Sequence, residues 1–223
     1  MASRGYGQYC GLARALELVG ERWALLIIRD LLVGPRRFTD LRKGLPRIPS
    51  NVLSDRLKEL ERDGIVRRRV LPRPASATVY ELTEYGLQLE QAVIQLGLWG
   101  AQSLGEVRAH EVVTPDSITM ALRSTFRPEA ARGKHLSFEL RMGPEIRLHA
   151  QVEDGTIQVS EQHSEKPDLV IDCGPAFKDL LTRELSPEAA LQQGIVRLDG
   201  DPKLFDSVAQ MFYIPGHRET AHV

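Results

Sequence analysis

Residues 48–64 constrain the fold more than any other stretch, because they predict one amphipathic helix between two turns. Pro49 or Ser50 suits the start of this helix, and Gly64 suits its end. The apolar residues recur at intervals of four and three, which places them on one face of a helix. They are Leu53, Leu57 and Leu60.

The opposite face of this helix carries short polar and basic side chains, the types that contact bases and phosphates. They are Ser50, Asn51, Ser54, Asp55, Arg56 and Lys58. Asn pairs with adenine and Arg with guanine through two hydrogen bonds each, whereas Asp55 either accepts from cytosine or orients Arg56. The stretch therefore predicts a DNA recognition helix whose base-reading residues lie between Ser50 and Arg56.

A short helix and two strands complete a winged helix-turn-helix around the recognition helix. Apolar spacing predicts the short helix over residues 38–45, with a turn into the recognition helix at residues 44–46. Residues 66–71 and 77–83 have the composition of strands, joined by a proline-bearing loop. Phosphate or groove contacts are expected from residues in and around this motif. They are Thr39, Lys58, Arg68, Arg69 and, at the tip of the wing, Arg73.

The charge distribution supports a nucleic-acid partner. Residues 1–103 hold 16 Lys and Arg against 11 Asp and Glu, a net charge of +5, although the whole chain has a net charge of −1. Within residues 36–73 the balance is 12 against 5, a net charge of +7. A solvated helix face is the commoner explanation of a single charge run. Here the basic block coincides with the predicted recognition helix, which favours double-stranded DNA as the partner.

Two helices are predicted before this motif, over residues 10–20 and 21–33, and one after it. The helix over residues 21–33 is apolar all round at its centre, so it should form the core of this half. The helix after the wing, over residues 83–104, carries two apolar stripes, more than one small domain covers. We expect a homodimer contact there, and packing against the second half of the chain is the alternative.

The second half predicts a sheet with one apolar face. From residue 136 to residue 152 apolar and polar residues alternate with a period of two, and the turn Asp154–Gly155 predicts a hairpin. Another short strand is predicted over residues 169–173. Together these strands predict an antiparallel meander covered by helices over residues 116–126, 176–184, 187–193 and 202–212. The fold class is therefore α+β. Between sheet and helices lies either a cavity for a small molecule or a fully packed core.

Composition excludes several function classes. No run of eighteen apolar residues predicts a membrane span, and the first residues lack an apolar signal core. The two cysteines, Cys10 and Cys173, predict neither a disulfide framework nor a zinc site, which fits a reducing cytoplasm. The histidine, serine and glycine spacings match no catalytic or nucleotide-binding motif. We expect no enzyme activity, no metal and no cofactor.

Several ordered motifs in residues 8–104 resemble the HxlR-type family of bacterial winged-helix regulators. They are residues 9–16, 20–31, 38–41, 53–60, 64–66 and 80–86. The resemblance implies a dimeric, sequence-specific DNA-binding regulator. Pro49 departs from the serine that usually opens the recognition helix, so Ser50 would have to supply the cap.

The same resemblance draws attention to Cys10, because some members of this family sense oxidants or electrophiles through a cysteine at this N-terminal place. A cysteine near a helix N-terminus has a lowered pKa, and Arg14 follows one turn later. The alternative is that Cys10 is an ordinary packing residue.

Residues 115–213 resemble sterol-carrier-protein-type lipid-binding domains. The motifs lie in residues 168–173, 177–181, 185–194 and 196–202. The resemblance implies an apolar pocket for a lipid-like ligand, for which we select four apolar residues of the predicted sheet and helices. They are Phe138, Leu140, Phe177 and Leu181.

The sequence thus predicts a dimeric transcriptional regulator whose second domain responds to a small apolar ligand. The alternative is a lipid or small-molecule carrier that uses its winged helix for protein contacts. The basic block around the recognition helix favours the regulator.

Overall fold

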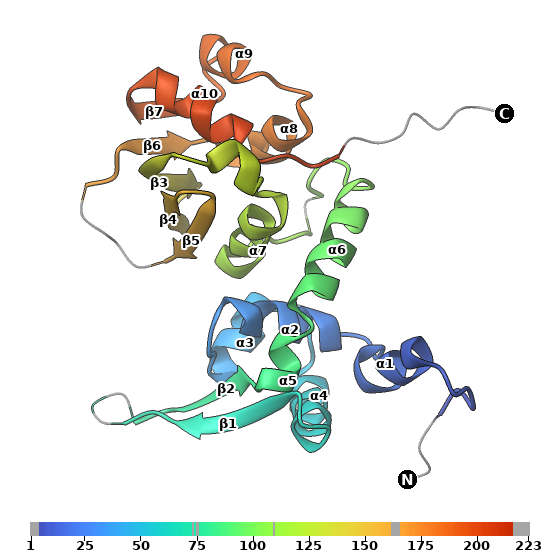
Figure 1. Cartoon of the computed structure of the whole chain (residues 1–223). Coiled ribbons are helices and arrows are strands. Elements are labelled where there is room, and N and C mark those ends of the chain that lie inside the picture. The colour runs from blue at the N-terminus through green and yellow to red at the C-terminus, as the bar shows by residue number, and fades with distance from the viewer. Residues whose placement is uncertain (1–4, 73, 75, 109, 162–165, 216–223) are drawn as a thin grey trace, which may run out of the picture. The chain divides into compact units, whose positions relative to one another are not determined.

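The computed structural model (Figure 1) describes residues 5–72, 74, 76–108, 110–161 and 166–215. The chain divides into two units, residues 1–93 and 94–223. In the described part of the chain, no helix combines the length and the apolar character needed to cross a membrane.

The first unit is a helical domain with a two-stranded antiparallel sheet, as the sequence predicts. Its elements are α1 (Gly11–Val19), α2 (Ala24–Val33), α3 (Phe38–Gly44), α4 (Ser50–Arg62), β1 (Val66–Val70), β2 (Thr78–Leu82) and α5 (Glu84–Leu87). The strands pair from Val66 with Leu82 to Val70 with Thr78, which forms the wing. Helix α6 (Glu90–Ala101) spans the boundary between the units.

Helix α2 is the core helix of the first unit. Ile27 and Ile28 on adjacent positions are both completely buried, because the helix is apolar all round and has neighbours on several sides. Even Asp30 is buried, and its Oδ1 accepts hydrogen bonds from the Arg29 guanidinium at 2.8 and 2.6 Å. A Cβ at Gly44 would lie 2.9 Å from Asp30 Oδ2, so glycine permits the close approach of α3 to α2.

The single helix predicted over residues 83–104 is two helices in the structure. Helix α5 ends at Leu87, and α6 begins at Glu90. Between them the Leu89 N–H donates to the Gly86 carbonyl, a tighter three-residue step than the four-residue step of an α-helix. Gly86 is fixed because it lies against the Ile65 carbonyl, so the chain bends there.

The second unit is an α+β layer. Its helices are α7 (Pro115–Thr125), η1 (Pro128–Ala131), η2 (Gly174–Ala176), α8 (Phe177–Thr182), α9 (Pro187–Gln192) and α10 (Pro202–Gln210). Its strands are β3 (His135–Met142), β4 (Ile146–Glu153), β5 (Thr156–Ser160), β6 (Leu169–Asp172) and β7 (Arg197–Gly200). The strand order is β5-β4-β3-β6-β7.

The predicted antiparallel meander is correct for β3, β4 and β5 but wrong for β6. Strand β6 pairs parallel with β3, from Phe138 with Leu169 to Arg141 with Asp172. It follows β5 in the chain yet joins the opposite side of β3, which requires a crossover instead of a hairpin. Strand β7, which the sequence analysis did not predict, pairs antiparallel with β6 at the edge.

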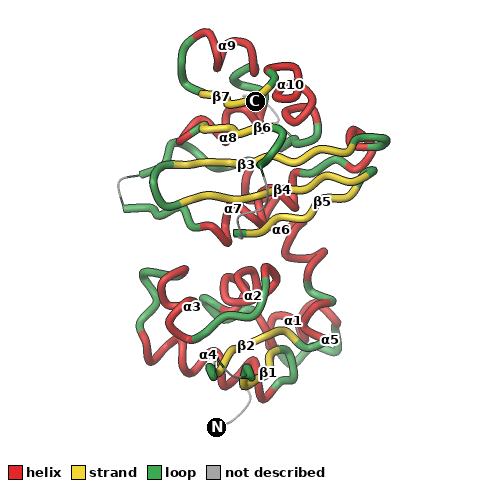
Figure 2. Tube along the Cα trace, turned by 90° about the vertical axis from the view of Figure 1, so that its left-hand side faces the viewer, coloured by secondary structure: helices red, strands yellow, loops and turns green. Residues whose placement is uncertain are grey.

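Helices cover one face of this sheet, as Figure 2 shows with α7 and α8 behind the strands. Inward-facing residues such as Leu148, Ala150 and Val152 on β4 are completely buried in the core. The residues between them on each strand point to the other face of the sheet. On that face Arg141 and Glu139 form an ion pair, with Arg141 Nε 2.5 Å from Glu139 Oε1.

Candidate nucleic-acid interface

The recognition helix α4 separates a buried leucine face from an exposed polar stripe. Leu53, Leu57 and Leu60 are at most 1% exposed, so they fix one side of the helix against the core. Asn51, Asp55, Lys58 and Arg62 are exposed and recur at intervals of four, three and four residues, which puts them on the opposite side. This stripe, called the outer stripe below, faces solvent, and Ser50 at the start of the helix is exposed as well.

The outer stripe is narrower than the predicted reading face. Ser54 is half-buried on its flank, and Arg56 lies on the other flank with a side chain only 20% exposed. Asp55 Oδ1 lies 3.6 Å from Lys58 Nζ within the stripe, so Asp55 orients Lys58, not Arg56. Arg62, which the sequence analysis did not select, joins the stripe with a side chain that is 71% exposed.

The start of α4 has no side-chain cap. Pro49 occupies the N-cap position with extended backbone (φ −64°, ψ 141°), and within the described residues this position makes no side-chain cap hydrogen bond. Ser50 is the first helical residue and does not replace the cap; its Oγ lies 3.5 Å from Arg42 Nη1, which donates to it. The first-turn N–H groups are therefore available to an acceptor such as a phosphate oxygen. Arg42 was missed by the sequence analysis, although it belongs to the basic block.

The three arginines of β1 are held in ion pairs. Arg67 and Arg69 point to one side of the strand and both donate to Glu81 on β2, at 2.8 and 2.7 Å. The two guanidinium groups, Arg69 first, lower the pKa of the Glu81 carboxyl below its ordinary value. Arg68 points to the other side and donates to Glu61 of α4 at 2.9 Å. The wing therefore presents oriented arginines, whereas Arg73 lies outside the described residues.

The remaining predicted contact, Thr39, is exposed in the first turn of α3. Its hydroxyl lies 3.5 Å from Asp40 Oδ1. The other Asp40 oxygen accepts from the Arg37 backbone N–H at 2.9 Å, which caps the helix. Thr39 is thus placed on a helix start next to the turn that leads into α4.

Two helices expose apolar side chains. Helix α1 exposes Leu12 and Leu16, and Tyr9 just before it is fully exposed. Helix α6 buries none of its twelve residues among the described parts of the chain. Its Trp99 is 72% exposed and Leu96 is 49% exposed. The exposed apolar side chains of α1 and α6 are therefore the surfaces on which the predicted homodimer contact can be tested.

Cys10 is an exposed thiol at the N-cap position of α1. The backbone N–H groups of Ala13 and Leu12 at the helix start lower the pKa of this thiol below the ordinary value of 9.0. The helix N-terminus therefore stabilises the thiolate, which is the reactive form of cysteine.

An apolar cavity lies between the sheet and helices of the second unit. It encloses about 40 Å³. The four residues selected from the sequence, Phe138, Leu140, Phe177 and Leu181, all line it, together with residues of α7, β6 and α10. Cys173 also lines it, and burial raises the pKa of this thiol to about 12. This volume is far less than the roughly 300 to 1,000 Å³ of a typical ligand site.

Residues 18–108 match the model of the HxlR-like helix-turn-helix family. The HTH-type transcriptional regulator YodB of Bacillus subtilis is 41% identical over 88 residues, which are 40% of this chain and 79% of YodB. The chain belongs to the HxlR-like helix-turn-helix family. An HTH-type transcriptional regulator of Mycobacterium tuberculosis, Rv3095, is 43% identical over 93 residues, which are 42% of this chain and 58% of that protein.

Solved structures of bacterial regulators are similar to less than half of the chain. The reduced form of YodB from B. subtilis has 38% sequence identity and a TM-score of 0.39, and covers 43% of this chain and 95% of that one. The redox regulator HypR in its oxidised form has 35% identity and a TM-score of 0.40, and covers 44% of this chain and 100% of that one.

The second unit carries a second family match. Residues 127–213 match the model of the SCP-2 sterol transfer family. These residues hold the whole sheet and helices α8 to α10. The chain thus joins an HxlR-like helix-turn-helix domain to an SCP-2-type domain.

Proposed function

We propose that this protein is a transcriptional regulator that binds double-stranded DNA sequence-specifically as a homodimer, and that it acts by binding and not by catalysis. The observation that carries the proposal is the outer stripe of α4, an exposed polar and basic surface on a helix whose other face is completely buried. A recognition helix of this kind lies in the major groove, and two copies read half-sites about one helical turn apart. The carrier alternative is not favoured, since the relatives are helix-turn-helix regulators.

The DNA-binding proposal is tested by selecting duplexes with the purified protein from a random-sequence library. We expect a pseudo-palindromic site. Asn51→Ala should weaken binding to that duplex by about 1–3 kcal/mol and relax the preference at one base pair, as loss of a bidentate base contact does. Arg69→Ala should instead weaken binding to all duplexes alike and reduce the salt dependence. Failure to enrich any sequence would contradict the proposal.

The homodimer proposal rests on the exposed apolar residues of α1 and α6. Trp99→Ala and Leu96→Asp should shift the protein from dimer to monomer in sedimentation analysis, because each removes apolar contact area. Val70→Asp is the matched control, since Val70 is an equally exposed apolar residue on the wing. A protein that stays monomeric without any substitution would exclude the dimer.

We infer that a small apolar ligand binds the SCP-2-type domain and modulates DNA affinity. The cavity is lined by apolar residues. Such a ligand fits there if α8 and α10 move outward and enlarge it. Native mass spectrometry of the purified protein should detect a co-purified apolar molecule. Removing it should change the affinity for the selected duplex, and an unchanged affinity would exclude modulation.

We further propose that Cys10 is an oxidant-sensing thiol, because it is exposed and its pKa is lowered. Treatment with diamide should change the affinity of the wild-type protein for the selected duplex. Cys10→Ser should abolish that response, whereas Cys173→Ser should keep it. An equal response in wild type and Cys10→Ser would exclude the role.

A further inference from the structure

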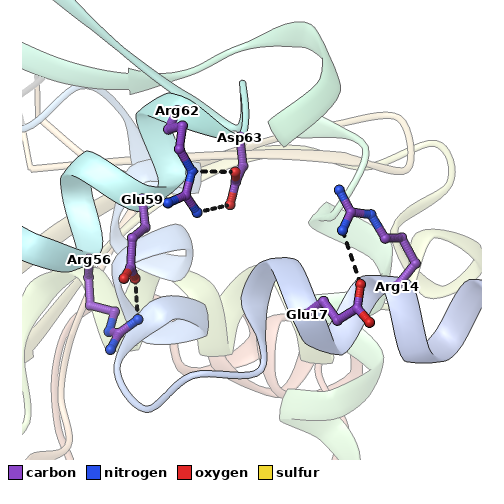
Figure 3. Close-up of polar contacts among 6 residues, drawn as sticks. All are labelled: Arg14, Glu17, Arg56, Glu59, Arg62 and Asp63. Carbon is purple, nitrogen blue, oxygen red and sulfur yellow. Dashed lines mark hydrogen bonds and ion pairs between the residues drawn. The ribbon is translucent and has the colours of Figure 1, made fainter. Parts of the chain in front are cut away.

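Arg56 stands apart from the other cations of the recognition helix. Lys58 and Arg62 have side chains that are 73% and 71% exposed, whereas the Arg56 side chain is 20% exposed. Its Nη1 donates to Glu59 one turn further along α4, as Figure 3 shows. Its Nε is buried and has no hydrogen-bond partner in the part of the chain that the structure describes.

A second carboxylate reaches Arg56 from outside the helix. Glu21 Oε2 lies 3.5 Å from Arg56 Nη2. Glu21 belongs to the turn between α1, which ends at Val19, and α2, which begins at Ala24. The Arg56 guanidinium is therefore an ion-pair bridge between the recognition helix and the turn that precedes the core helix.

The turn that holds Glu21 has a defined backbone. Trp23 adopts the left-handed conformation with φ 82°, which few residues other than glycine adopt. The Arg22 guanidinium lies 5.1 Å from the centre of the Trp23 ring, a cation–π contact, and the Ala24 N–H donates to the Glu21 carbonyl at 3.1 Å. The backbone that carries the Glu21 carboxylate is thus defined, and from it the carboxylate reaches a side chain of α4.

The leucine face and the ion pair between Arg56 and Glu21 restrain different movements of α4. Leu53, Leu57 and Leu60 hold α4 against the core through non-directional apolar packing. An ion pair on the flank resists rotation of the helix about its own axis, because rotation would separate Arg56 from Glu21. Base contacts require side chains held to within about half an ångström of their productive positions, so such a rotation would misplace the outer stripe.

We propose that Arg56 is a positioning residue that fixes the outer stripe of α4 for base reading by anchoring the helix to Glu21. This inference rests on the proposed DNA-binding function. It also replaces the expectation that Arg56 itself pairs with guanine. A bidentate contact with guanine requires guanidinium nitrogens that face the groove. In Arg56 one nitrogen is buried and the other two face carboxylates.

Glu21→Gln distinguishes the two roles of Arg56, because they predict opposite changes in DNA affinity. If Arg56 is an anchor, losing Glu21 lowers affinity for the duplex that the wild-type protein selects, by about twofold to fivefold, as loss of such an ion pair implies. If Arg56 reads a base, losing Glu21 frees it and raises that affinity. Glu17→Gln is the matched control. It removes the same charge and an ion pair, with Arg14, that does not involve α4 (Figure 3).

The measured quantity is the ratio of affinities for the selected duplex and for a scrambled duplex, with circular dichroism confirming folding at the assay temperature. We expect Glu21→Gln to lower this ratio relative to Glu17→Gln. An unchanged or increased ratio overturns the inference.

Arg56→Met should lower the ratio similarly and weaken the preference at all base pairs of the site together. Loss of preference at a single base pair would identify Arg56 as a base reader and overturn the inference. Should Arg56→Met fail to fold, Glu21→Gln decides alone. A wild-type protein that selects no duplex overturns the proposed function and this inference together, whereas the outcomes above overturn the inference alone.

Discussion

The two cysteines illustrate how one residue type acquires opposite chemistry from its surroundings. Cys10 is exposed at the start of α1, where the backbone N–H groups of Ala13 and Leu12 lower the pKa of its thiol. Cys173 lies in the apolar cavity of the second unit, where burial raises the pKa to about 12. Only the thiolate is a nucleophile, so the two side chains should differ sharply in reactivity.

We therefore predict that iodoacetamide at pH 8 alkylates Cys10 in the native protein and leaves Cys173 unmodified. Peptide mass spectrometry should find both residues modified once guanidinium chloride has unfolded the chain. The alkylation rate of native Cys10 should reach half its maximum below pH 9.0, the ordinary value for the thiol. Equal native labelling of both residues would contradict the prediction.

Within the recognition helix, the sequence predicted the helix itself but not the role of each residue on it. Periodicity identified the buried leucines and the exposed Asn51, Asp55 and Lys58, because these positions depend only on the helical repeat. It did not reveal that Arg56 faces Glu21, because that contact joins residues 35 positions apart and depends on how α4 packs. Arg62 was overlooked at the last turn of the helix, although the helical repeat places it on the outer stripe.

At the level of elements, the start of α5 depends on Gly86. An added Cβ at this position would lie 2.2 Å from the Ile65 carbonyl oxygen, which belongs to the backbone. The same carbonyl accepts from the Thr83 N–H at 3.0 Å, so it is held in place between α5 and the wing.

We predict that Gly86→Ala lowers the free energy of unfolding by about 2–4 kcal/mol, since overpacking against backbone has little room to relax. Chemical denaturation measures this change. Gly97→Ala is the control, because a Cβ there meets nothing within 4 Å and alanine favours a helix. Equal stability of the two variants would contradict the prediction.

The β3–β4 pair carries a pH-dependent contact. His135 and Glu153 face each other across the strands, with His135 Nδ1 2.5 Å from Glu153 Oε2. The hydrogen bond with Glu153 raises the pKa of His135 above 6.5, and the same contact lowers the pKa of Glu153 below 4.5. Because Glu153 holds the protonated His135 ring in the folded protein, their contact stabilises the fold below about pH 6.5. This contribution is lost as the pH rises through the pKa that His135 has in the folded protein. The lowered glutamate pKa stabilises the fold above about pH 4.5 and is lost as the pH falls.

The contact should therefore contribute most between about pH 4.5 and 6.5. We predict that the difference in Tm between wild type and His135→Gln is larger at pH 5.5 than at pH 9, with wild type more stable at pH 5.5. Thermal unfolding followed by circular dichroism tests this. A difference that grows with pH would contradict the assigned pairing.

The elements themselves were predicted best where the pattern is local. The alternation of β3 and β4 and the hairpin at Gly155 follow from neighbouring residues, and both are in the structure. The parallel pairing of β6 depends on the path of the chain between strands, which alternation does not record. Strand β7 has only four residues, Arg197–Gly200, and only Leu198 of these faces the core, so no period was visible.

In the whole molecule, the two units carry net charges of opposite sign. Residues 1–93 hold the same 16 basic and 11 acidic side chains as residues 1–103, so all of the positive excess lies in the helix-turn-helix unit. The SCP-2-type unit has a net charge of −6.

Sequence motifs predicted both units, because each family pattern is spread over many positions. They did not predict the cavity volume, which depends on the packing of side chains from five or more elements.

The cavity leads to a prediction about ligand binding. Leu181 lines it and is 6% exposed, so Leu181→Ala should lower the free energy of unfolding by about 2–5 kcal/mol and enlarge the cavity. An apolar molecule that binds in the enlarged space stabilises the native state, and the stabilisation grows with the ratio of its concentration to its dissociation constant. Toluene should therefore raise the Tm of Leu181→Ala in differential scanning calorimetry more than it raises the Tm of wild type.

Leu136→Ala separates cavity filling from general effects of the solvent. Leu136 is buried in the same core, at 7% exposure, but does not line the cavity. Toluene should shift the Tm of Leu136→Ala less than that of Leu181→Ala, because Leu136 does not line the cavity and its truncation should not enlarge it. Equal shifts in the two alanine variants would show that the cavity at Leu181 has no special capacity for apolar molecules. The ligand-responsive role proposed for this unit would then lose its structural basis.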